Sequence, residues 1–349
     1  MKKFLLLFCT ITAFTFSFGQ KNVDIDDLKL KVTYRLSPAR PQTPLFFYYN
    51  TQIDFGSPVI KNNVNIESLE RSLSIDGQRK TEDAEKAKLT LEISFSEFLI
   101  SEVDVKEHVY TNKDGSKSYS YDLNIEYTMP KSYRILEATN VVESQVYKTL
   151  TGAKKKYSHS SRFNTSREAR NYWENNKETL SARFMRETTQ ELANGASYRA
   201  SILYGFYVYT NDIRLRTTDE KKHPENIPFQ EKANALKKAL EAMTPETGLN
   251  LDELKEIIEY FQAIPERFAD PKLKADRKLR YAAYYNLAKL YTYAENMEKS
   301  DEYADLLIAN DESPKDGEKI KKENTGIREI MGRTIIGTTH FDVNDFWKE

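Results

Sequence analysis

The chain has 349 residues, with 52 lysines and arginines against 53 aspartates and glutamates, four histidines and one cysteine. This near-neutral balance gives no support to general nucleic-acid binding, which needs a strongly basic surface. The only cysteine, Cys9, lies in a segment that we expect to be removed. The mature protein would then have no disulfide, thiolate metal site or cysteine nucleophile. The length is sufficient for two domains with hydrophobic cores of their own.

The first twenty residues have the three-part layout of a secretory signal peptide. A lysine pair is followed by an apolar stretch over residues 4–16, and small residues precede a cleavage point between Gly19 and Gln20. We therefore expect removal of residues 1–19 and a periplasmic or secreted protein. A lipoprotein is the less favoured alternative, because Cys9 is not preceded by the usual small residue. No later run approaches the roughly 20 apolar residues of a membrane helix, so we predict no transmembrane segment.

Residues 20–218 are predicted to form one α+β domain that is mostly antiparallel. Apolar and polar residues alternate strictly over residues 89–96, the period of a half-buried strand. Residues 103–110 and 119–127 alternate on either side of Asp114-Gly115, which predicts a hairpin.

A helix is predicted to cross this sheet. It begins at Thr165, which has capping-box spacing to Glu168, and ends at Asn194-Gly195. A strand over residues 201–215 is expected to follow the helix and complete the sheet.

Residues 219–229 are charged and contain proline, and we interpret them as a linker to an all-α domain over residues 230–326. Apolar residues recur there at three- and four-residue steps. The predicted helices cover residues 230–243, residues 250–264, a segment that begins at Asp270-Pro271, and residues 298–309. The tail, residues 327–349, alternates enough to be either a closing strand or a docking segment.

The last two of these helices resemble a tetratricopeptide repeat (TPR) over about residues 281–314. Residues 284–291 (YYNLAKLY) resemble its first helix, Ser300 occupies the small position of the second helix, and Tyr303 its aromatic region. The match departs from the family pattern in lacking a glycine at the helix turn and in having Leu307 where a small residue is usual.

The resemblance implies a concave groove and a core on opposite faces of the first helix. The groove would be lined by Ala282, Tyr285, Lys289, Thr292 and Tyr293, and the core would contain Tyr284, Leu287, Ala288 and Tyr291. Lys289 is the clearest surface candidate. The alternative is that Tyr285 and Tyr293 pack against a neighbouring helix instead of facing a partner.

No motif predicts catalysis, a metal or a cofactor. The histidines, His108, His159, His223 and His340, lack metal-ligand spacing, and no nucleophile elbow or phosphate loop occurs. Only 12 glycines are present, which disfavours a loop-built active site. A hydrolase that uses two carboxylates leaves no local signature and stays as an unfavoured alternative.

We therefore expect a non-enzymatic protein that acts as an interaction or scaffold module in the bacterial cell envelope. Its partner would be another envelope protein, such as an outer-membrane complex, held on the concave face by Tyr285, Lys289, Thr292 and Tyr293. The main alternative is a glycan-binding module, because tyrosine combines an apolar face with a polar rim. The tyrosines that favour it are Tyr48, Tyr49, Tyr204, Tyr207 and Tyr209.

Overall fold

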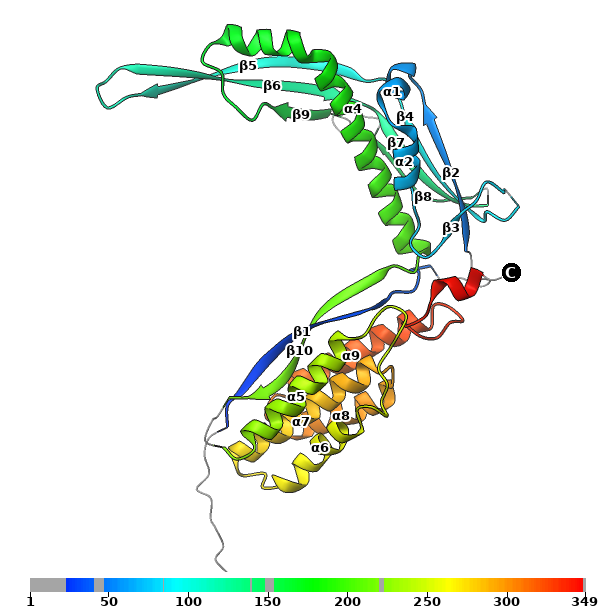
Figure 1. Cartoon of the computed structure of the whole chain (residues 1–349), viewed down its shortest axis with the longest axis vertical. Coiled ribbons are helices and arrows are strands. Elements are labelled where there is room, and N and C mark those ends of the chain that lie inside the picture. Colours follow the sequence, from blue (N-terminus) through cyan, green and yellow to red (C-terminus); the bar gives the residue numbers. More distant parts are fainter. Residues whose placement is uncertain are drawn as a thin grey trace, which may run out of the picture. The chain divides into compact units, whose positions relative to one another are not determined.

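The computed structural model describes residues 23–40, 47–83, 85–138, 140–147, 154–219 and 223–347. The fold is α+β, as predicted, with most strands in the N-terminal part of the chain and most helices in the C-terminal part (Figure 1). The predicted signal peptide, residues 1–19, lies outside the described residues. Within the described ranges, no helix combines the length and the apolar character that crossing a membrane requires.

The chain divides into two compact units. In its described part, the helical unit contains residues 23–33 and 210–328, and the sheet unit contains residues 34–209 and 329–347. This division differs from the linker predicted at residues 219–229, since most of the preceding strand belongs to the helical unit. The first helix of that unit also begins inside the predicted linker.

A five-stranded sheet forms one part of the sheet unit, with the order β3-β2-β4-β7-β8. Its strands are β2 (Tyr48–Phe55), β3 (Arg79–Lys80), β4 (Leu89–Phe95), β7 (Lys131–Glu137) and β8 (Asn140–Tyr147). Strand β4 pairs parallel to β2 and antiparallel to β7. Every second residue of β4 is buried, which confirms the strand predicted from its alternation. Two short helices follow β2: α1 (Pro58–Asn63) and α2 (Ile66–Ser72).

A three-stranded sheet with the order β5-β6-β9 forms the other part. Strands β5 (Leu99–Thr111) and β6 (Lys117–Thr128) pair antiparallel over their whole length, and β9 (Lys154–Ser158) pairs with the end of β6. The hairpin predicted from Asp114-Gly115 is confirmed. Gly115 has a φ of +81°, a left-handed conformation that glycine adopts without steric cost.

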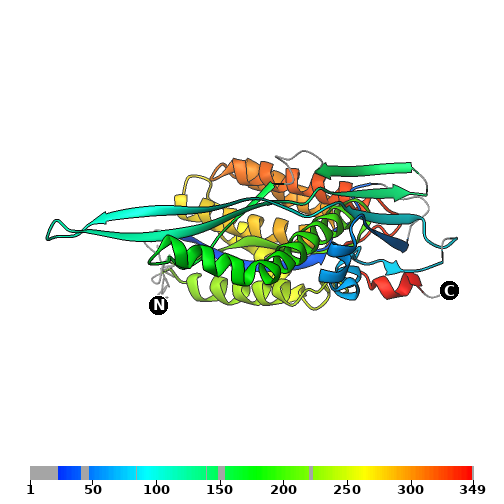
Figure 2. The same cartoon turned by 90° about the horizontal axis from the view of Figure 1, so that it is seen from above.

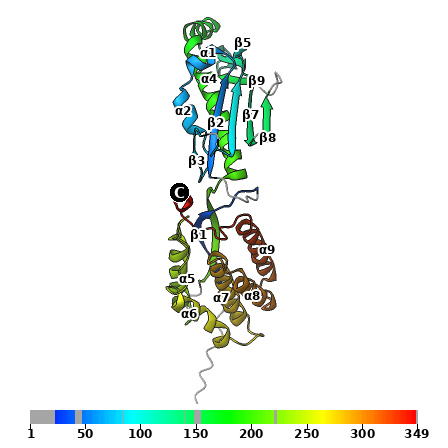
Figure 3. The same ribbon diagram turned by 90° about the vertical axis from the view of Figure 1, so that its right-hand side faces the viewer.

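The long helix α4 (Ser166–Tyr204) packs across both sheets of this unit (Figures 1 and 3). Its predicted start is confirmed, because the Thr165 hydroxyl accepts the Glu168 N–H at 3.1 Å. Its predicted end at Asn194-Gly195 is wrong. The helix continues because small buried residues beyond that point, Ala196 and Ala200, pack in the core, while Gly195 is exposed and meets nothing.

The later start of the next strand follows from this longer helix. Strand β10 is Val208–Thr218, so the strand predicted from residue 201 begins seven residues too early. Strand β10 pairs with β1 (Ile25–Arg35) in a two-stranded ribbon. The Asp219 N–H donates to the Asp24 carbonyl at 3.0 Å, and the Thr33 and Thr210 hydroxyls lie 3.2 Å apart, so the two strands run antiparallel.

The helical unit confirms the four predicted helices, with shifted ends, and adds a fifth. They are α5 (Asn226–Glu241), α6 (Lys255–Arg267), α7 (Lys274–Tyr293), α8 (Met297–Ala309) and the unpredicted α9 (Pro314–Met331). Proline can occupy the first turn of a helix, since the N–H it lacks has no helical partner there. Pro314 therefore begins α9.

Of the two alternatives for residues 327–349, the closing strand is wrong for the described part, residues 327–347, which contains no strand. Residues 327–331 complete α9, and the 3-10 helix η1 (Val343–Trp347) lies near the end of the described chain.

Candidate functional site

Helix α7, on which the sequence places the partner groove, is the most enclosed helix of its unit. All four predicted contact residues, Tyr285, Lys289, Thr292 and Tyr293, are buried, and so is Ala282. The side chains that cover them come from strand β10 and helix α9 of the same unit. The predicted groove is therefore filled by the chain itself.

Strand β10 lies against one side of α7 through Arg216. The Asn286 amide accepts the Arg216 backbone N–H at 2.7 Å and donates to the Arg216 carbonyl at 2.8 Å. The Arg216 guanidinium lies 4.5 Å from the centre of the Tyr285 ring and pairs with Asp316 at 3.1 Å. Stacking on a tyrosine and pairing with a carboxylate are both favourable for a planar guanidinium.

The same contacts shift the pKa values of the ionisable groups. Burial raises the pKa of Tyr285 to about 12, so this phenol stays protonated at physiological pH. Burial alone would also raise the pKa of the Asp316 carboxyl. A hydrogen bond from the Tyr281 hydroxyl and the charge of Arg216 outweigh that effect and hold the pKa of Asp316 below its ordinary value. These groups form a structural charge cluster.

Helix α9 covers the remaining predicted residues. Its Glu323 pairs with the Lys289 ammonium and accepts a hydrogen bond from the Tyr293 hydroxyl at 2.8 Å. Its Asn324 accepts a hydrogen bond from the Thr292 hydroxyl at 2.8 Å and donates to Ser300 of α8 at 2.8 Å. The polar groups at this helix junction are thus mutually satisfied.

The prediction of Lys289 as an exposed contact is wrong. This side chain is only 9% exposed, and a buried ammonium is tolerated because Glu323 compensates its charge. Tyr285 and Tyr293 follow the alternative interpretation and pack against neighbouring elements. The sequence could not indicate this arrangement without α9, which was missed.

The histidines do not assemble a metal site in the part of the chain that the structure describes. No group of three or more histidine, cysteine, aspartate or glutamate side chains is placed there to hold a metal ion. His108 pairs with Asp122 at 2.6 Å on hairpin β5-β6. Ser120 lies opposite His108 in the ladder, but its hydroxyl has no hydrogen-bond partner among the described residues. Ser120 and His108 therefore do not form the hydrogen bond that joins a nucleophile to its base.

The tyrosines proposed for glycan stacking do not share one surface. Tyr49 and Tyr204 are buried in the core of the sheet unit, and Tyr204 belongs to helix α4 rather than to a strand. Tyr207 instead lines a cavity of about 200 Å³ with the exposed Tyr198 of α4. Tyr198 was missed because it lies beyond the predicted end of the helix.

Hairpin β5-β6 carries an exposed apolar pair, Val109 and Tyr119, that sequence reasoning did not single out. Near its base, Leu123 and Ile125 are buried under α4. Beyond the N-terminal end of α4, the hairpin continues without a covering helix (Figures 1 and 2). On the same face, Val109 and Tyr119 lie directly opposite each other and are 50% and 48% exposed. Glu107 and Tyr121 separate this exposed apolar pair from the part of the same face that the unit itself buries.

Comparisons with known proteins assign no family. No family model matches the chain, and no curated protein matches it. A solved structure described as a minor lipoprotein from Acinetobacter baumannii is similar at 9% sequence identity with a TM-score of 0.22. The similarity covers 45% of this chain and 95% of that chain. At this TM-score it carries no argument about fold or function.

Proposed function

We propose that this protein acts in the cell envelope by binding another protein, without catalysing a reaction, and that the distal half of hairpin β5-β6 is a contact surface. The observation that carries the proposal is the uncovered apolar pair of Val109 and Tyr119. These residues continue the face that α4 buries nearer the base of the hairpin. Burial of such apolar residues against a partner removes them from water and makes the free energy of binding more favourable.

The backbone of the hairpin supports the same role. In the three-stranded sheet, β5 is an outer strand, so one row of its N–H and C=O groups faces away from β6. An exposed edge of this kind can pair with an extended segment of another chain. Backbone pairing along β5 and side-chain contact at Val109 and Tyr119 would then act together.

Photo-crosslinking in cells tests this contact. A photoreactive phenylalanine at position 119 is expected to form a discrete crosslinked product with a partner. The matched control is position 106, because Lys106 is exposed on the opposite face of the same hairpin, on the neighbouring strand β5. Equal crosslinking from both positions, or from neither, would contradict the proposal. Because Tyr119 is exposed, the probe should change the free energy of unfolding by no more than about 0.5 kcal/mol.

We propose further that α7 and α8 form a TPR-like hairpin used inside the molecule. The small Ser300 is buried and donates to the Ala288 carbonyl at 2.9 Å, and Tyr303 stacks on Tyr291 with ring centres 5.6 Å apart. These contacts support the resemblance. A partner could contact Tyr285, Lys289, Thr292 and Tyr293 only after α9 and β10 had moved, so we place the partner on the hairpin.

Glycan binding is the second candidate function, carried by the exposed Tyr198 beside Tyr207. Asp76 lines the same cavity and supplies the kind of polar group that binds a sugar hydroxyl. If the site binds sugar, envelope polysaccharide fragments should bind the native protein about tenfold more tightly than a Tyr198→Ala/Tyr207→Ala variant. Tyr209→Ala is the matched control, since Tyr209 is exposed but does not line the cavity. Calorimetric titration measures this, and equal affinity of the native protein and the double variant would exclude the site.

A further inference from the structure

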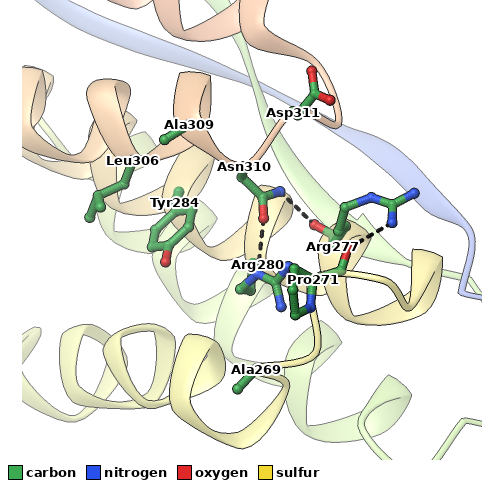
Figure 4. A pocket seen from close by; sticks show the side chains of 9 residues that line it. All are labelled: Ala269, Pro271, Arg277, Arg280, Tyr284, Leu306, Ala309, Asn310 and Asp311. Carbon is green, nitrogen blue, oxygen red and sulfur yellow. Dashed lines mark hydrogen bonds between the residues drawn. The ribbon is translucent and has the colours of Figure 1, made fainter.

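A cavity of about 670 Å³ lies in the helical unit between the loop after α6, the first half of α7 and the end of α8 (Figure 4). Its polar lining comes from Arg277, Arg280, Tyr284, Asn310 and Asp311, of which Arg280 and Tyr284 lie one turn apart on α7. Its apolar lining consists of Ala269, Pro271, Leu306 and Ala309. Arg280 and Tyr284 lie on the face of α7 opposite the predicted partner groove, so the cavity is distinct from it.

The Arg280 guanidinium is buried without a neutralising carboxylate. The residue is 8% exposed, and its Nε donates to the Asn310 amide oxygen at 2.9 Å. Its Nη1 donates to the backbone carbonyls of Phe268 at 2.5 Å and Asp270 at 3.3 Å. These acceptors are all neutral. Within the described ranges of the chain, Arg280 has no ion pair, and its Nη2 has no hydrogen bond.

Other polar groups at the cavity leave this charge available. The Arg277 guanidinium donates to the Pro271 carbonyl at 2.9 Å, and its Nε lies 3.7 Å from Glu312. The Asp311 carboxylate points away from Arg280 (Figure 4). The Tyr284 hydroxyl has no hydrogen-bond partner among the residues described by the structure. One uncompensated positive charge and one free hydroxyl donor therefore reach the cavity.

We infer that this cavity binds a monoanionic carboxylate carried on a small apolar group. A guanidinium matches the geometry of a carboxylate, and the Tyr284 hydroxyl can donate a second hydrogen bond to it. Leu306 and Ala309 offer apolar surface to the attached group. A doubly charged phosphate fits less well, because a single guanidinium would have to neutralise it in a cavity that Asp311 also lines. This inference goes beyond the proposed role of the hairpin and does not depend on it.

Two sources present this chemistry, namely the C-terminal residue of a peptide and a free short-chain acid. Titration calorimetry on the full chain separates them with three probes: a short flexible peptide ending in alanine with a free carboxylate, the same peptide amidated at its C-terminus, and valerate. The acid peptide is expected to bind at least about tenfold more tightly than the amide. Saturable binding of valerate alone would assign the cavity to small acids. Equal binding of acid and amide peptides without valerate binding, or no binding of any probe, would overturn the inference.

Variants of the cavity locate the binding. Arg280→Met nearly keeps the length of the side chain and is expected to lower the affinity for the probe at least about tenfold. Arg280→Lys should recover part of the affinity. Lys255→Met is the matched control, because Lys255 is an exposed cation outside the cavity, and unchanged affinity is expected.

Two further variants keep the test decisive if Arg280→Met does not fold. Tyr284→Phe removes only the hydroxyl and should weaken binding about threefold. Leu306→Asp places a negative charge, which repels the ligand carboxylate, on an exposed residue of the cavity wall. It should abolish binding without unfolding the unit. Native affinity in both variants would overturn the assignment of the cavity.

Discussion

Replacing Asn286 with alanine is expected to lower the free energy of unfolding of the helical unit by about 3 kcal/mol. Asn286 is fully buried, and both ends of its amide bond to the backbone of Arg216 in β10. Strand β10 pairs with β1 in a ribbon of only two strands, and Asn286 satisfies backbone groups that no third strand reaches. The alanine variant would leave a buried N–H and a buried C=O without these partners.

Urea titration followed by circular dichroism measures this loss, and hydrogen exchange at the amide of Arg216 locates it. The Arg216 amide should exchange much faster in the variant than in the native protein. Asn234→Ala is the matched control, because Asn234 is an exposed helical asparagine that bonds only within its own helix. It should change the free energy of unfolding by less than about 0.5 kcal/mol. A loss below about 1 kcal/mol in Asn286→Ala would show that water or a local shift replaces the amide.

Much of the fold could be predicted because local sequence and final packing agree over most elements. The alternation in β4 matches a sheet with one face buried, and the cap at Thr165 forms as its spacing indicates. Helix α9 could not be predicted in this way. Its buried positions are Gly317, Ile320, Asn324 and Ile327, of which only two carry apolar side chains, so few apolar residues mark the buried face of this helix.

The prediction of a partner groove on α7 was wrong for a related reason. The residues predicted for the groove do lie on one face of α7. That face is covered by β10 and by α9, and both contacts are polar: Asn286 and Arg216 on one side, Lys289 and Glu323 on the other. Polar pairs between distant segments leave no periodic signal in a sequence. Tyr284, predicted as core, is only half-buried and lines the cavity beside Arg280.

The close approach of α9 to α8 gives the second large effect. A Cβ atom on Gly317 would lie 2.6 Å from the Ala304 carbonyl oxygen and 2.6 Å from the Ile308 Cγ1. Both distances are shorter than a normal contact, and the carbonyl belongs to a helix backbone that cannot move aside. Gly317→Ala is therefore expected to destabilise the helical unit by about 2 kcal/mol, despite the better helix propensity of alanine.

Gly326 is the matched control in the same helix. A Cβ atom there meets nothing within 4 Å, so Gly326→Ala should stabilise the unit by about 0.5–1 kcal/mol through helix propensity alone. Urea titration of both variants should thus give changes of opposite sign. If Gly317→Ala were neutral or stabilising, α9 would not be held closely against α8. Its cover over Lys289 and Tyr293 could then open, and the groove on α7 would become available to a partner after all.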